Sequence, residues 1–103
     1  MLGGSWVIDF LEKVNIDKAF ISAAGISYDK KITTSNRELA NIIIKVFEKS
    51  SEVNLLVDST KFSKAAMINM STVEQCKRII TDSNINIQVA SGFKNIGRCE
   101  LVF

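Results

Sequence analysis

The stretch VNLLVDSTKFSK, residues 53–64, places an apolar run directly before acidic, hydroxyl and basic side chains. The run from Val53 to Val57 has the length and the β-branched content of a buried strand. The next four residues, Asp-Ser-Thr-Lys at 58–61, have no role in an apolar core. This strand therefore either stops at a surface turn or delivers a binding site to its carboxyl end.

The length and composition predict one compact domain over residues 1–103. A chain of 103 residues buries roughly 65% of its unfolded surface when it folds. Hydrophobic residues make up 47% of the chain and charged residues 23%, and the mean hydropathy is +0.17. This is apolar for a short chain and indicates strands that are buried on both faces.

The charge and the residue types exclude several classes of site. The net charge of +2 comes from 13 basic and 11 acidic residues that are interspersed, so no basic face for nucleic acid is indicated. Histidine is absent, which excludes a Ser-His-Asp triad, a Cys-His pair and a histidine-ligated zinc site. Cys76 and Cys99 lack C-x-x-C spacing and are expected to be buried, reduced thiols. We expect neither a metal nor a cofactor.

The chain shows no membrane or secretion signal. Its start, MLGGSWVIDFLEKV, has no basic leader, and no stretch approaches the roughly 18 apolar residues of a membrane helix. We therefore expect a soluble, cytoplasmic protein that makes no contact with a membrane.

Periodicity predicts three helices. The clearest spans residues 36–50, because Leu39, Ile42, Ile43, Val46 and Phe47 repeat at helical spacing. Ser35 and Glu38 are predicted to form its capping box. A second capping box at 71–74 predicts a short helix through residue 77, and residues 5–14 predict another helix, capped by Ser5.

Further strands are predicted at 18–24, 78–82 and 99–103, with an alternating strand at 85–89 and a polar loop at 28–31. The order strand, helix, strand, helix, strand predicts an α/β fold, a three-layer and mostly parallel sheet flanked by helices, as in Rossmann-like proteins. The ligand crevice of such folds lies beyond the carboxyl ends of the strands. Residues 24–26, 58–61 and 81–82 and the helix start at 33–36 should therefore meet there, where hydroxyls, free N–H groups and a lysine form an anion site.

Three charged residues at this edge each have two interpretations. Lys61 either binds a phosphate or carboxylate or is a solvated lysine in a turn. Asp58 either orients Lys61 and accepts from a sugar hydroxyl or caps the turn. Asp82 either belongs to the site or forms a plain Asx turn.

The remaining candidates are small or polar. Thr34 and Asn36 either donate to a ligand or cap the long helix. Gly25 allows a close backbone approach, by a ligand or by a neighbouring loop.

Four stretches, IDKAFISAAGIS (16–27), ITTSN (32–36), VNLLVDSTKF (53–62) and RIITD (78–82), resemble the C-terminal effector-sensing domain of DeoR-family bacterial transcriptional regulators. The resemblance covers about residues 15–83. It implies a sugar-phosphate isomerase-like fold, related to ribose phosphate isomerase and CoA transferases, of which the chain would be the second half. The family's winged helix-turn-helix is absent from these 103 residues.

The resemblance implies a regulator that binds a phosphorylated sugar, contacts DNA only through the absent domain, and forms a homo-oligomer. A lysine in a similar acid-Ser-x-Lys turn contacts the substrate in the related enzymes, which points to Lys61. The predicted ligand-binding residues are Gly25, Thr34, Asn36, Glu38, Asp58, Lys61 and Asp82, and no catalytic residue is expected. In the family, an acidic residue followed by alanine commonly starts the long helix. This chain departs from that pattern, because the position of the acidic residue falls on Leu39 or, with a one-residue slip, on Glu38.

Two alternatives remain open. The first is an isomerase-like or transferase-like enzyme with Glu38 as general base and Lys61 as electrostatic stabiliser. The second is a structural or dimerising fragment with a non-functional pocket, whose bare sheet face a second copy would cover.

Overall fold

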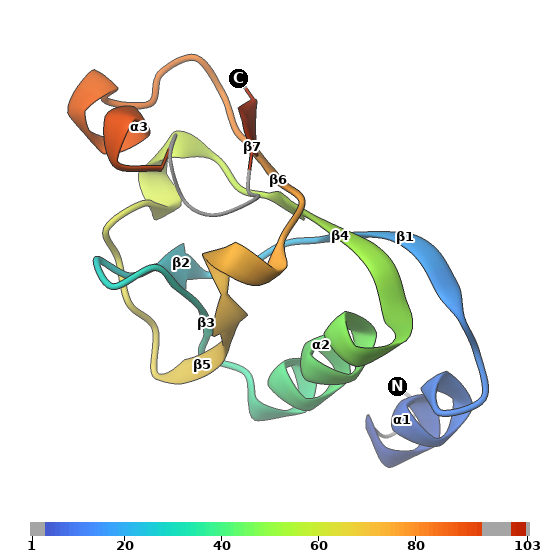
Figure 1. The fold of residues 1–103 in the computed structure, drawn as a ribbon. Helices are drawn as coiled ribbons and strands as arrows, with labels where there is room; N and C mark the ends of the chain where they lie inside the picture. The colour runs from blue at the N-terminus through green and yellow to red at the C-terminus, as the bar shows by residue number, and fades with distance from the viewer. Residues whose placement is uncertain (1–3, 94–99, 103) are drawn as a thin grey trace.

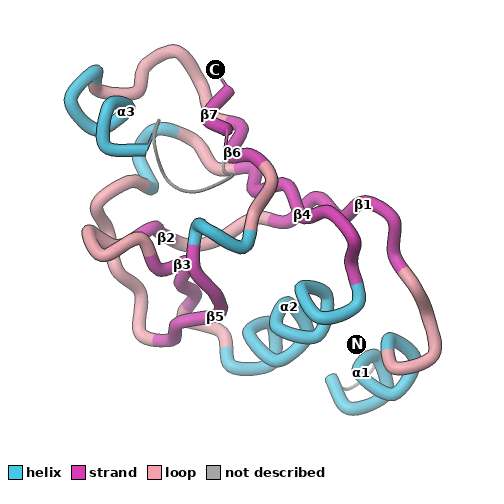
Figure 2. Tube along the Cα trace, viewed as in Figure 1, coloured by secondary structure: helices cyan, strands magenta, loops and turns pink. Residues whose placement is uncertain are grey.

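The structure, a computed structural model, describes residues 4–93 and 100–102 (Figure 1). Helices and strands are interspersed along the chain, with β1, β2 and β3 in succession between α1 and α2 (Figure 2). Their order is α1 (Gly4–Leu11), β1 (Ile16–Ile21), β2 (Gly25–Ile26), β3 (Lys31–Thr34), α2 (Arg37–Lys49), β4 (Ser50–Leu56), a 3₁₀ turn (Ser59–Lys61), β5 (Ile68–Thr72), a 3₁₀ turn (Val73–Gln75), β6 (Arg78–Ile80), α3 (Ile87–Phe93) and β7 (Glu100–Val102).

Within the described residues, four strands form a parallel sheet in the order β1-β4-β6-β7. This confirms the predicted α/β class and the parallel sheet with flanking helices. The strands β2, β3 and β5 form a small antiparallel sheet that was not predicted. A parallel bridge between Ile26 and Phe62 connects β2 to the chain that follows β4.

One hydrophobic core joins α2 and both sheets. Leu55 and Ile79 of the parallel sheet and Ile26 and Ile32 of the antiparallel sheet are completely buried in it. Ala40 and Ile43 of α2, together with the inner side chains of β4, belong to the same cluster. The helical periodicity of residues 39–47 therefore marks the face of α2 that packs on the sheet.

The start of α2 differs from the predicted capping box. Asn36, not Ser35, is the N-cap, and its Oδ1 accepts a hydrogen bond from the Leu39 N–H at 3.0 Å. The Asn36 N–H in turn donates to the Thr34 hydroxyl at 3.3 Å. The cap therefore forms one residue later than predicted, with the Asn36 side chain in place of that of Ser35.

The predicted capping box at 71–74 is wrong. Ser71 and Thr72 belong to β5, where they pair with Ile32 and Lys31 of β3. Only the 3₁₀ turn Val73–Gln75 follows, and the Thr72 side chain makes no capping bond. The backbone at 71–72 is used by the sheet ladder, which takes precedence over a local cap.

The predicted strand at 85–89 is also wrong, because α3 (Ile87–Phe93) occupies most of that stretch. Its buried side chains, Ala90 and Phe93, are three residues apart, whereas Ile87 is exposed. The Asn86 Oδ1 accepts from the Gln88 N–H at 2.8 Å and holds the first turn. The apolar alternation in this short window does not correspond to a buried face.

Several predicted boundaries shift. The strand predicted at 18–24 is β1 (Ile16–Ile21), and Lys31 belongs to β3 rather than to a loop. The first helix spans Gly4–Leu11, so Ser5 lies within it instead of capping it. The predicted last strand is β7, while Cys99 lies outside the described residues. Cys76 is buried, as predicted.

The parallel sheet has a second face, which we call the outer face, formed by Phe20, Asn54, Leu56, Arg78, Ile80 and Val102. Cross-strand register places Phe20, Asn54 and Arg78 in one row and Leu56, Ile80 and Val102 in another. Phe20, Leu56 and Val102 are 60%, 41% and 37% exposed within the described structure. Separately, none of the described helices is long and apolar enough to cross a membrane.

Candidate functional site

The turn after β4 is fixed by its own aspartate. The Asp58 carboxylate accepts hydrogen bonds from the N–H of Thr60 at 2.9 Å and from the Thr60 hydroxyl. These two bonds, the hydroxyl first, lower the pKa of the Asp58 carboxyl below its ordinary value. Asp58 is therefore an ionised cap of the turn Ser59–Lys61, which corresponds to the structural interpretation of this residue.

Asp82 holds the same turn from the end of the neighbouring strand. Its Oδ2 accepts from the Ser59 N–H at 2.8 Å, and its Oδ1 accepts from the Asn84 N–H at 3.0 Å. The bond from the Ser59 N–H is the main reason that the pKa of Asp82 is lowered. Asp82 thus forms a local Asx turn and also joins the carboxyl ends of β4 and β6.

Lys61 is the cation that this arrangement presents. Its side chain is half-buried, and within the described part of the chain it forms no ion pair with a carboxylate. Asp58 is close enough for the Lys61 charge to contribute to its lowered pKa. An ammonium that has no carboxylate partner is able to bind a phosphate or a carboxylate of a ligand.

Gly25 packs against a loop. A Cβ on Gly25 would lie 2.2 Å from the carbonyl oxygen of Lys64, so only glycine fits. The Thr33 hydroxyl, which is buried, donates to the Gly25 carbonyl at 2.7 Å and accepts from the Ala66 N–H at 2.9 Å. Of the two interpretations of Gly25, the observed close approach is that of the neighbouring loop.

Within the described residues, Thr34 and Asn36 at the start of α2 bond to neighbouring backbone and not to this cluster. Thr34 is buried and bonded to the Asn36 N–H, Asn36 caps the helix, and Glu38 is exposed in the first turn. Figure 1 shows the start of α2 on the far side of β3 from the turn Ser59–Lys61. The structure thus brings together Asp58, Lys61 and Asp82, with the Gly25 loop beside them, and leaves the helix start apart.

A hollow of about 360 Å³ lies at the carboxyl ends of β4 and β6 and is lined by Leu56, Val57, Asp58, Ile80, Thr81 and Asp82. The Thr81 hydroxyl is buried there without a hydrogen-bond partner among the described residues. A buried hydroxyl that lacks a partner is costly, so it marks a place where water or a ligand group is expected. Thr81 is a candidate that the ligand-binding prediction missed, although the Thr-Asp pair at a strand end signals it.

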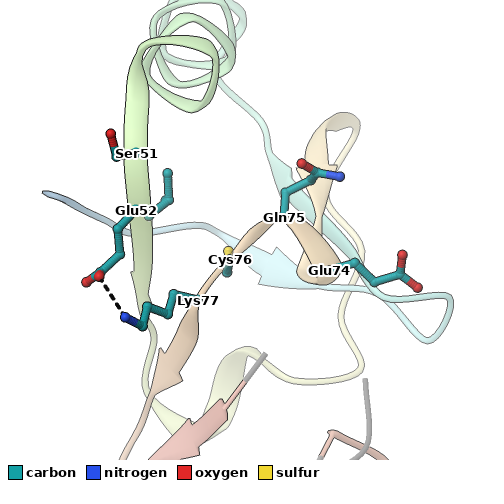
Figure 3. Close-up of a pocket in the computed structure, with 7 residues that line it drawn as sticks. Ser51, Glu52, Glu74, Gln75, Cys76 and Lys77 are labelled. Atoms are coloured by element: carbon teal, nitrogen blue, oxygen red, sulfur yellow. Dashed lines mark ion pairs between the residues drawn. The ribbon is translucent and has the colours of Figure 1, made fainter. Parts of the chain in front are cut away.

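A larger hollow, of about 450 Å³, lies at the opposite, amino-terminal edge of the sheet (Figure 3). Glu52 on its wall pairs with Lys77 at 3.1 Å and Arg78 at 3.2 Å and accepts from the amide of the buried Asn54 at 2.9 Å. The Asn54 bond, and then Lys77, lower the pKa of Glu52. Because these charges are already paired within the chain, the carboxyl edge remains the better candidate site.

Across the described ranges, no group of three or more Cys, Asp or Glu side chains is placed to hold a metal ion. The polar groups at the carboxyl edge are two carboxylates, an ammonium and hydroxyls. Such groups are able to accept hydrogen bonds from hydroxyls and to make one contact with a negative charge.

Comparison with known proteins identifies the class. The family model described as the DeoR C-terminal sensor domain matches residues 1–83. The chain belongs to this family, as a fragment that covers part of the sensor domain of a transcriptional regulator. The resemblance found in the sequence is thereby confirmed.

Three relatives illustrate the match. The HTH-type transcriptional regulator IolR of Bacillus subtilis is 33% identical over 76 residues, which are 74% of this chain and 30% of the relative. The L-fucose operon activator of Haemophilus influenzae is 29% identical over 75 residues, 73% of this chain and 30% of the relative. The glycerol-3-phosphate regulon repressor of Escherichia coli is 26% identical over 80 residues, 78% of this chain and 32% of the relative.

The chain spans about a third of the length of the curated relatives that it matches. These similar proteins are transcriptional regulators and not enzymes. The isomerase or transferase alternative is therefore not supported, and Glu38 has no assigned role as a general base.

Proposed function

We propose that this chain is the effector-binding part of a DeoR-type regulator and that its effector is a phosphorylated sugar held at the carboxyl edge of the parallel sheet. The observation that carries the proposal is the turn Ser59–Lys61, which Asp58 and Asp82 fix in place while Lys61 has no carboxylate partner among the described residues. A regulator of the glycerol-3-phosphate regulon among the relatives fits an effector that carries phosphate.

In this proposal each residue has a distinct task. The Lys61 ammonium contacts the phosphate, and the free lone pairs of Asp58 and Asp82 accept hydrogen bonds from sugar hydroxyls. The unpartnered Thr81 hydroxyl supplies one further bond. Gly25 acts indirectly, because it allows the close approach of the loop at Lys64, whereas Thr34, Asn36 and Glu38 lie at the separate start of α2 and have no contact with the effector in this proposal.

Binding of this kind regulates without chemistry. An effector that contacts one arrangement of the sensor better than another shifts the balance between them by the difference in binding free energy. In a complete regulator that shift would be passed to a DNA-binding domain. DNA contact is accordingly proposed for the regulator and not for these 103 residues.

Thermal unfolding with a panel of sugar phosphates tests the proposal. A ligand at 100 times its dissociation constant stabilises the native state by about 2.7 kcal/mol, on the order of 10 °C for a domain of this size. We expect at least one sugar phosphate to raise the melting temperature and Lys61→Ala to remove the shift. Lys64→Ala, which removes an exposed ammonium three residues away, is the matched control and should keep it.

A second function, self-association, is favoured by the outer face. Sheets of parallel strands are normally covered on both faces, whereas Phe20, Leu56 and Val102 are exposed here. The Glu52 carboxylate beside this face pairs with Lys77 and Arg78. We propose that a second copy of the chain covers the exposed apolar side chains and so forms a homo-oligomer.

A further inference from the structure

A third hollow, of about 320 Å³, lies between the β2–β3 turn, Ser63 and α3. Phe93 of α3 contributes an aromatic wall, and Phe62 meets it edge-on with ring centroids 5.0 Å apart. The aromatic wall is thus fixed by core packing. The rim is polar and includes Lys30, Ser63 and Gln88.

Both sides of this hollow carry backbone strain. Lys30 and Ser63 have φ angles of 66° and 60°, and they are the only residues other than glycine with positive φ in the described structure. Lysine and serine are disfavoured in this left-handed region, which glycine and asparagine occupy more readily. Two strained positions on one hollow indicate that the side chains at those positions have a use.

The Lys30 ammonium is positioned but not neutralised. Its Nζ lies 4.3 Å from the centroid of the Phe93 ring and 3.4 Å from the Tyr28 carbonyl oxygen. Within the described residues it forms no ion pair, and the nearby Asp29 carboxylate accepts from the Ser27 hydroxyl. That bond is also the main reason that the pKa of Asp29 is lowered.

Polar groups without internal partners surround the ammonium. The hydroxyl of Ser63 and the side-chain amide of Gln88 make no hydrogen bond in the described part of the chain, and both line the hollow. Gly92 lies on the α3 side, where even a Cβ would come within 3.8 Å of the Lys30 Nζ. The absence of a side chain there leaves the ammonium accessible from the hollow.

We propose that this hollow is a second binding site, specific for a small organic anion. The phosphate or carboxylate of the ligand pairs with Lys30, its polar groups bond to Ser63 and Gln88, and its apolar face lies on Phe93. The site shares no lining residue with the carboxyl-edge hollow.

Amide chemical shifts of the ¹⁵N-labelled chain, titrated with inorganic phosphate, a hexose phosphate and a hexonate, test the proposal. We expect saturable shifts at residues 27–31, 63 and 88–93 with at least one organic anion. Lys30→Asn should weaken that binding at least tenfold, because asparagine fits the backbone but lacks the charge. The hexose phosphate and the hexonate distinguish a phosphate from a carboxylate as the bound group.

The controls separate this site from the one at Lys61. Lys61→Ala should leave the affinity at the hollow within a factor of two, and Lys30→Gly provides a second charge-free variant that relieves the same strain. The proposal is overturned if none of the three anions gives a saturable shift at these residues. It is equally overturned if Lys61→Ala abolishes the shifts while Lys30→Asn and Lys30→Gly retain them.

Discussion

Asp82 acts across 23 residues of sequence, because its carboxylate accepts from the Ser59 N–H and so fixes the turn that carries Lys61. This bond favours the ionised carboxylate, so the pKa of Asp82 lies below its ordinary value of 3.8 in the folded chain. A carboxyl with a lowered folded pKa contributes stability at pH values above the ordinary one. The contribution is lost as the pH falls through the lowered value.

We predict that Asp82→Asn lowers the free energy of unfolding at pH 7 and that the difference from wild type shrinks as the pH falls below about 4. Urea unfolding between pH 7 and pH 3 measures this. Asp17→Asn, at an exposed position in β1, is the control and should follow the wild-type curve. A constant difference at every pH would contradict the role assigned to the Asp82 charge.

Gly25 gives a second prediction for a single residue. Gly25→Ala should lower the free energy of unfolding by about 1–3 kcal/mol, because the new Cβ would meet the Lys64 carbonyl oxygen at 2.2 Å. Chemical denaturation measures the loss. Gly92→Ala places a Cβ at an ordinary contact distance within α3 and should be neutral or stabilising. Equal stability of the Gly25→Ala variant would show that the loop has room to move.

The sequence predicts single residues at this edge with partial success. Asp58, Lys61 and Asp82 were expected together because parallel strands end at one edge, and Asp58 and Asp82 both accept from backbone N–H groups of the turn that carries Lys61. The helix start was placed with them by the same rule. It lies apart because β3, which no periodicity revealed, separates it from the turn.

Among the elements, α2 was predictable and the short strands were not. Thirteen residues of α2 present a continuous apolar stripe, whereas β2, β3 and β5 are two, four and five residues long. A stretch of two to five residues carries too few positions to show a period of two. The α3 segment fails for the same reason, since seven residues fit either pattern.

Two alanine variants distinguish the predicted N-cap of α2, Ser35, from the observed N-cap, Asn36. Asn36→Ala should cost about 1 kcal/mol, because it removes the acceptor of the Leu39 N–H. Ser35→Ala should cost less than about 0.5 kcal/mol, as an exposed position outside the cap. Thermal or urea unfolding of both variants compares them. A larger loss for Ser35→Ala would restore the capping box that the sequence predicted.

For the whole molecule, composition alone suggested strands buried on both faces, yet the described residues cover only the inner face fully. Which face stays open depends on how α2 crosses over the sheet, and an isolated sequence does not reveal that. The matched stretches make up about a third of the length of the relatives.

The proposed homo-oligomer makes a prediction about mass. The wild-type chain should sediment as a dimer or larger species, and Leu56→Glu on the outer face should shift it toward monomer, because a carboxylate would be buried in the contact. Ile44→Glu on α2 is the matched control, since both side chains are 41% exposed. A wild-type monomer at high concentration, or equal effects of both variants, would contradict the contact.

The account depends most on Lys61, and calorimetric titration tests its role directly. A sugar phosphate and the same sugar without phosphate are titrated into the wild-type chain and into Lys61→Ala. We predict that the wild type binds the phosphorylated form and that Lys61→Ala weakens this binding about tenfold or more, the equivalent of one charged hydrogen bond. Equal affinity of the two proteins, equal affinity for both sugars, or no binding of any sugar phosphate would contradict the account.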